Sequence, residues 1–183
     1  MLRAGLIILG IAAVLTGCGE TTSNNGPFAP GVARNEQGVD PMLVGHRLMD
    51  AGEHELAIKS YSQAALEQGM TAEVLSGIGS AYLALGRVGQ AEELLRDAID
   101  ADETSPETWN NLGVALMEQG ETAEAAQVFR RAYAIDNGQS DSIRDNLRLA
   151  LAKTENPVYD AEIEQDYKVV RRGSSDFLIR KIP

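Results

Sequence analysis

Only a few residues of this 183-residue chain have side chains suited to chemistry near neutral pH: one cysteine and two histidines. His46 and His54 lie eight residues apart, and we expect them on different helices of one hairpin. That placement alone makes neither a metal site nor an acid–base pair. The sequence has no HExxH motif, no cysteine cluster and no glycine-rich phosphate loop. It therefore predicts no catalytic residue, no cofactor and no metal, and an enzyme that uses His46 or His54 is kept only as an alternative.

The cysteine, Cys18, follows an apolar run of twelve residues over 4–15. This run has the length of a secretory signal core and is too short to span a bilayer comfortably. The sequence Leu15-Thr16-Gly17-Cys18 resembles the lipobox of bacterial lipoproteins. The resemblance implies that a signal peptide, 1–17, is removed and that acyl chains on Cys18 hold the mature protein to a membrane. The alternative is an uncleaved anchor or an incidental buried thiol.

Gly19 follows the cysteine, where an aspartate is the familiar signal for retention at the inner membrane. By this resemblance we expect anchoring in the outer membrane, with the protein facing the periplasm. Residues 18–37 are rich in Gly, Pro, Asn, Thr and Ser without an apolar period, which is typical of a flexible linker. The folded part is therefore expected to stand off the membrane.

Small and large residues recur along the rest of the chain at a spacing of thirty-four. The series are Gly45, Gly79 and Gly113; Ala57, Ala91 and Ala125; Ala64, Ala98 and Ala132; the turn glycines Gly52, Gly86 and Gly120; and the large residues Tyr61, Leu95 and Phe129. Small residues at fixed places let two antiparallel helices approach closely, while large residues fill the space beside them. The spacing predicts an all-α fold of helical hairpins, which stack because one hairpin cannot bury its apolar face alone.

The third unit, with Trp109-Asn110-Asn111-Leu112-Gly113 and then Ala125, Phe129 and Ala132, resembles the tetratricopeptide repeat. The resemblance implies a right-handed superhelix of three hairpins that binds another protein. The predicted domain, 38–153, comprises repeats 38–71, 72–105 and 106–139 and a capping helix, where Arg144 and Arg148 replace Trp109 and Gly113. We expect helices over 41–51, 54–67, 72–85, 88–101, 106–119, 122–135 and 140–153.

In tetratricopeptide folds the first helix of each hairpin lines a concave groove, and this resemblance assigns the candidate binding residues. They are Met42, His46, Met49, Ser76, Ser80, Leu83, Asn110, Val114, Met117 and Leu149. We expect Met49, Leu83 and Met117 to form one apolar seam that receives a partner helix. The alternative for each residue is that it only covers the neighbouring helix.

Charge narrows the choice of partner. The chain has 27 Asp and Glu against 16 Lys and Arg, a net charge of -11, which argues against nucleic acid as a partner. Glu73, Glu107 and Glu118 are expected on the groove rim, where they favour a partner with some positive charge. The Lys and Arg residues of the family's carboxylate clamp, which grips a peptide C-terminus, are absent from this groove.

The last segment, 154–183, has a different composition, with acidic residues followed by basic ones. Two short β-favouring runs, 167–170 and 177–182, flank Arg172-Gly173-Ser174-Ser175 and indicate either a marginal hairpin or a segment that folds on a partner. Because two strands alone are barely stable, we expect disorder in isolation, with an interaction arm as the alternative.

The lipobox, linker, repeats and the cap sequence Leu147-Arg148-Leu149-Ala150-Leu151 together resemble the TadD-type lipoproteins of tight-adherence (Flp) pilus systems. The resemblance implies an outer-membrane assembly factor that binds the secretin, as a pilotin does, or another pilus component. A general scaffold for cell-envelope or outer-membrane biogenesis is the alternative among binding proteins. An envelope enzyme that uses His46 or His54 is the alternative from a different class.

Overall fold

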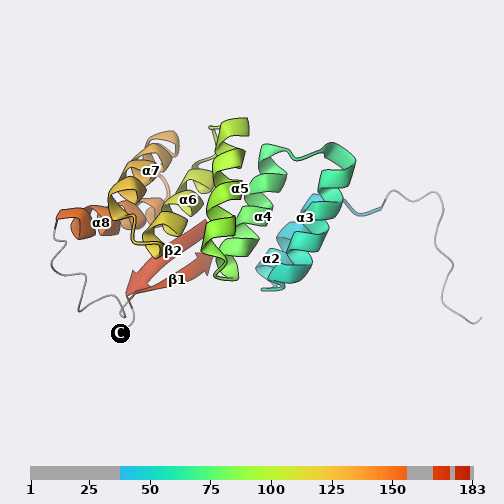
Figure 1. The fold of residues 1–183 in the computed structure, drawn as a ribbon, viewed down its shortest axis with the longest axis horizontal. Helices are drawn as coiled ribbons and strands as arrows, with labels where there is room; N and C mark the ends of the chain where they lie inside the picture. The colour runs from blue at the N-terminus through green and yellow to red at the C-terminus, as the bar shows by residue number, and fades with distance from the viewer. Residues whose placement is uncertain (1–37, 156–166, 174–175, 182–183) are drawn as a thin grey trace, which may run out of the picture. The chain divides into compact units, whose positions relative to one another are not determined.

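The computed structural model describes residues 38–155, 167–173 and 176–181. The predicted signal peptide, Cys18 and the linker before Gly38 lie outside these residues. The described helices are α2 (Pro41–Asp50), α3 (His54–Gln68), α4 (Ala72–Ala84), α5 (Val88–Ala101), α6 (Pro106–Glu118), α7 (Thr122–Ile135) and α8 (Asp141–Glu155). Each begins and ends within two residues of its predicted position. The predicted three hairpins and capping helix are therefore confirmed, and Figure 1 shows them stacked in sequence order.

The first helix of each hairpin begins at a side-chain cap. Asp40 accepts a hydrogen bond from the Met42 amide at 2.8 Å, and Thr71 accepts one from the Val74 amide at 3.3 Å. Ser105 caps α6 in the same way, and Pro106 follows it at the first helical position, where a missing amide proton costs nothing. Local sequence thus fixes where α2, α4 and α6 start.

The turn inside each hairpin has the same geometry in all three repeats. Gly52, Gly86 and Gly120 have φ values of 79°, 70° and 81°, in the left-handed region that residues with a Cβ rarely adopt. In the second repeat the Arg87 amide, just after the glycine, donates to the Tyr82 carbonyl at 2.9 Å, which satisfies one of the free carbonyls at the end of α4. The recurring glycine therefore sets how the second helix leaves the first.

The close helix contacts lie at the predicted glycines. A Cβ added to Gly113 would stand 2.5 Å from the Phe129 ring, and one added to Gly45 would stand 2.3 Å from the Tyr61 ring. Both rings are almost fully buried. The glycine of one helix and the large residue of the next therefore occupy one shared space, as the spacing predicts.

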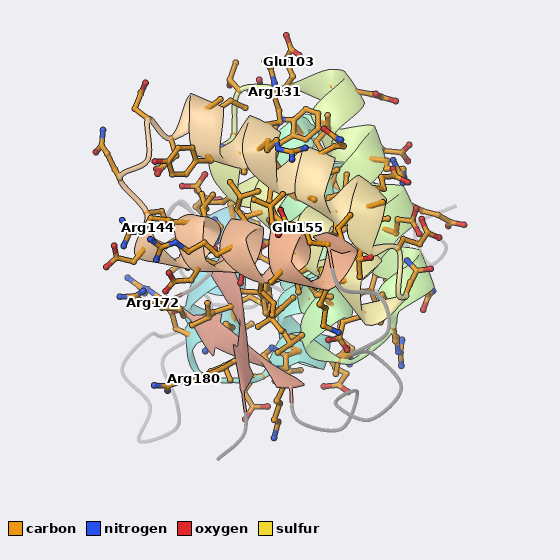
Figure 2. The ribbon with its side chains drawn as sticks, turned by 90° about the vertical axis from the view of Figure 1, so that its left-hand side faces the viewer. Glu103, Arg131, Arg144, Glu155, Arg172 and Arg180 are labelled. Carbon is orange, nitrogen blue, oxygen red and sulfur yellow. The ribbon has the colours of Figure 1, made fainter. Side chains whose placement is uncertain are left out.

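No helix among the described residues is long and apolar enough to cross a membrane. The buried apolar residues form two clusters, one centred on repeat one and α4, the other on α5 to α8. Glu103 and Arg131, labelled in Figure 2, form an ion pair at 3.1 Å on the outside of the stack, where it adds little stability.

The C-terminal segment contributes a β-hairpin to the second cluster. Strands β1 (Tyr167–Arg172) and β2 (Asp176–Lys181) pair antiparallel, with Val169 opposite Ile179. Strand β2 contacts α6 and α8, and its Phe177 side chain is only 2% exposed. Residues 167–172 and 176–181 therefore form the hairpin that the sequence analysis gave as one alternative, and docking on the helices adds the burial that two strands alone lack.

Candidate functional site: the concave groove

The predicted groove residues lie together on the first helices of the hairpins and on α8, but few of them are accessible. Met42, Met49, Ser80, Leu83, Asn110, Val114 and Met117 are buried, whereas His46, Ser76 and Leu149 are partly exposed. One part of the groove is open to solvent, and the β-hairpin formed by β1 and β2 covers the other part.

The structure corrects the expectation of an open apolar seam. Met49 is 0% exposed, Leu83 5% and Met117 8%, so a partner helix could not reach them as they stand. Leu83 and Met117 belong to the same apolar cluster as Phe177 of β2, and Met49 packs in the cluster of repeat one. Helical spacing placed these side chains on one face, but it carried no information about the segment that packs there.

The open part of the groove is a pocket of about 210 Å³ between α2, α4 and the start of α6. Its lining has many hydroxyls and three carboxylates but no lysine or arginine: His46, Tyr61, Ala72, Glu73, Ser76, Gly77, Ser80, Asp102, Ser105, Glu107 and Thr108. Two hydrogen bonds from Thr104 lower the pKa of Asp102, so its carboxylate is charged at neutral pH. The pocket is therefore polar and negative.

One end of this pocket holds a chain of hydrogen-bonding groups. The Tyr61 phenol lies 3.1 Å from His46 Nδ1, and His46 Nε2 lies 3.6 Å from a Glu73 carboxylate oxygen. The arrangement could suggest an activated nucleophile. Burial, with added repulsion from Asp50 and Glu73, raises the pKa of Tyr61 well above its ordinary value, so the phenol stays protonated and is a poor nucleophile.

The second histidine does not join this group in a metal or catalytic site. His54 lines a different hollow, beside the β1 residues Lys168 and Arg171. In the part of the chain that the structure describes, no group of three or more His, Cys, Asp or Glu residues could hold a metal ion.

The covered part of the groove holds strand β2 through two buried asparagines. Asn110 of α6 and Asn146 of α8 both donate to the Phe177 carbonyl oxygen, at 3.0 Å and 2.7 Å. The Ile179 amide donates to the Asn146 side-chain oxygen at 3.0 Å, and Asn146 also donates to Asn110 at 2.9 Å. These bonds satisfy the main chain at the edge of β2 that faces away from β1.

The side chain of Asp176, which begins β2, is also bound. It accepts a hydrogen bond from Asn110 at 2.7 Å and another from the Ser142 hydroxyl. Burial raises the pKa of the Asp176 carboxyl above its usual range, and Glu107 adds to the shift, while Ser142 and Arg172 oppose it. The carboxylate is bound by these hydrogen bonds, but the loss of its hydration on burial offsets part of their stabilisation.

Sequence reasoning found Asn110 but missed Asn146 and Ser142. The available signal was helical spacing: Ile143, Asn146 and Ala150 fall on one face of α8, so a polar residue stands among buried ones. A buried asparagine needs partners, and in this chain they come from a segment about thirty residues further on.

A family model described as "Tetratricopeptide repeat" matches residues 45–106 and 77–140, together more than half of the chain. The chain belongs to the tetratricopeptide-repeat family. This family's repeats mediate protein–protein interactions, and no catalytic family is indicated. Tetratricopeptide repeat protein 7B of mouse is 42% identical over 52 residues, which cover 28% of this chain and 6% of the mouse protein. The human protein of that name matches equally.

Solved tetratricopeptide domains share the fold. The Sgt2 TPR domain from Aspergillus fumigatus has a TM-score of 0.62 at 26% identity, covering 67% of this chain and 82% of that domain. The type III secretion translocator chaperone SycD of Yersinia enterocolitica has a TM-score of 0.57 at 17% identity, covering 63% and 92%. The second TPR domain of human RPAP3, solved with an HSP70 peptide, has a TM-score of 0.56 at 22% identity, covering 62% and 93%. At these lower identities the likeness shows the fold alone.

Proposed function

We propose that this chain is a lipid-anchored periplasmic scaffold that binds another protein through its open groove pocket and assists assembly of a tight-adherence (Flp) type pilus. The anchoring part of the proposal is supported by the lipobox that ends at Cys18 and by the linker after it. The pilus part is supported by the resemblance of the whole domain order to TadD-type lipoproteins. The secretin of the outer membrane is the partner that we propose, with this chain as its pilotin.

The charge of the pocket is the observation that supports it as the binding site. Glu73, Asp102 and Glu107 line it, and the lining contains no lysine or arginine to neutralise them. A partner segment with lysine or arginine would place its positive charge among these carboxylates, while hydroxyls such as Ser76 and Thr108 offer further hydrogen bonds. The charge is opposite to what a peptide with an acidic C-terminus requires.

The experiment compares two double variants with equal loss of charge. Glu73→Gln/Glu107→Gln removes charge from the pocket, and Glu93→Gln/Glu121→Gln removes the same charge from exposed positions outside the pocket lining. We expect the wild type and the second variant to capture the secretin from envelope extracts and the first variant to lose it. Equal capture by all three proteins would show that the pocket is not the binding site.

Identity of the partner is tested separately from the site. If the captured protein, identified by mass spectrometry, is an envelope component without any pilus role, the pilus assignment is wrong and the general scaffold takes its place. The genes beside this one give a second check, since a secretin, a secretion ATPase and a small pilin are expected there.

A further inference from the structure

Most of the hydrogen bonds between the groove and β2 involve the backbone of the strand. Asn110 and Asn146 bind the carbonyl of Phe177 and, in the case of Asn146, the amide of Ile179. Every residue except proline offers the same two groups, so any extended strand in this register could make these bonds. The two asparagines complete the strand edge as a third strand would.

Three side chains of β2 add selectivity to this backbone binding. Phe177 is 2% exposed and Ile179 is 9% exposed, and both belong to the apolar cluster of the last repeat and α8. Asp176 binds Asn110 and Ser142. The site therefore accepts an acidic residue, then an aromatic one, then any residue, then an aliphatic one.

The rest of the hairpin is held less well. Val170 of β1 remains 39% exposed. Arg171 donates to the Asp50 carbonyl at 3.0 Å and pairs with the Asp50 carboxylate at 3.6 Å, a contact with an exposed partner that adds little stability. Arg172 and Arg180 point away from the helices in Figure 2 and are exposed. A two-stranded hairpin has little stability of its own, so the site holds β2 mainly through residues 176–179.

We propose that the Asn110–Asn146 surface is a strand-binding site, that β2 is its intramolecular ligand, and that a partner protein binds there by replacing β2. The partner presents an extended segment with the pattern acidic, aromatic, any, aliphatic. This surface is separate from the acidic pocket, so either one can fail in an experiment while the other holds.

The test uses the full chain with Cys18→Ser, and the probe is a fluorescein-labelled peptide, Ser-Ser-Asp-Phe-Leu-Ile-Arg-Lys, with the sequence of residues 174–181. Fluorescence anisotropy measures its affinity. Phe177→Ala weakens the intramolecular ligand, so we expect this variant to bind the peptide at least about tenfold more tightly than the parent, because more of its sites are open. Val170→Ala, a truncation on the exposed part of the hairpin, should bind like the parent.

Two controls locate the binding. Adding Asn146→Ala to Phe177→Ala should abolish it, and a peptide with Ala in place of Phe should not bind although it keeps the basic residues that could enter the acidic pocket. If Phe177→Ala keeps its helical circular dichroism but binds no more tightly than the parent, the proposal is wrong.

Ile179→Ala is the second variant, and it decides the test if Phe177→Ala loses its fold. It truncates the other buried apolar side chain of β2 and leaves the residues of the site unchanged. We expect it to bind the peptide more tightly than the parent does. Binding equal to that of the parent by a folded Ile179→Ala protein would overturn the proposal.

Discussion

Asn146→Ala is the substitution that most directly tests how the hairpin is held. The Asn146 side chain is 0% exposed, and its loss leaves the Ile179 amide and the Asn110 side-chain oxygen without the partners they have in the wild type. Each buried group left unsatisfied costs about 1–3 kcal/mol, so a hairpin that stayed docked would lose about 2–6 kcal/mol. The Phe177 carbonyl keeps its bond from Asn110 and adds little to this cost.

The hairpin can avoid that cost by leaving the groove, which exposes Phe177 and Ile179 at about 1.5–3 kcal/mol each. The two costs are similar, so we expect the variant to open the hairpin locally while the helices stay folded. If the free energy needed to open the hairpin falls by about 2 kcal/mol, amide exchange across β1 and β2 becomes roughly thirty-fold faster. The thermal midpoint of the helices should change little.

Hydrogen exchange measured by mass spectrometry gives the result segment by segment. Asn111→Ala is the matched control, because the neighbouring Asn111 is equally buried but donates to Ser80 of α4 at 3.0 Å. We expect it to loosen the helices more than the hairpin. Unchanged exchange in β1 and β2 of Asn146→Ala, or equal acceleration in all helices, would refute this account of the docking.

Three further predictions concern the helix contacts at the glycines, the pH dependence of docking and the membrane anchor. Gly113→Ala should lower the thermal midpoint by an amount equivalent to about 1–3 kcal/mol, because its Cβ would stand 2.5 Å from the buried Phe129 ring. Gly89→Ala, whose Cβ meets nothing within 4 Å, should raise the thermal midpoint by an amount equivalent to about 0.5–1 kcal/mol. If calorimetry shows shifts of the same sign for both variants, the close contact between Gly113 and Phe129 is contradicted. Because burial raises the pKa of Asp176, the docked hairpin binds a proton more tightly than the released one, and docking should strengthen as pH falls from neutral through the raised pKa. Protection of β1 and β2 from amide exchange, corrected for the intrinsic rate at each pH, should rise accordingly in the wild type and should not do so in Asp176→Asn. Cys18→Ser should release the intact repeats from membranes on fractionation, and a variant still tightly bound would contradict lipid anchoring.

The helices could be predicted from the sequence because their determinants are local and repeated. A glycine at 113 and a phenylalanine sixteen residues later pack together, and the same pair of positions recurs in the other repeats. The two strands were also visible as β-favouring runs. The thirty-four-residue spacing predicts the contacts within each repeat and between adjacent repeats, and these contacts determine the helical part of a stacked fold.

Which part of the groove is open and which is covered could not be predicted from the repeat spacing. Asn110 and the strand it binds are separated by 66 or 67 positions, and no period relates the two. Met117 lay on the predicted face, but whether that face is open depends on a segment outside the repeats. The pocket lined by Glu73 and Glu107 is accessible because β2 packs against α6 and α8 further along the groove and contributes no residue to the lining of the pocket.

The identical turns at Gly52, Gly86 and Gly120 have a consequence for how this architecture could be extended or redesigned. The acidic pocket is built mainly by repeats one and two with the start of α6, whereas the strand site is built by α6 and α8. Because each repeat contacts only its neighbours, another unit of thirty-four residues could be inserted between repeat three and α8, or before repeat one, as a module. An insertion before repeat one would leave both sites intact, whereas one before α8 would separate Asn110 from Asn146 and divide the strand site alone.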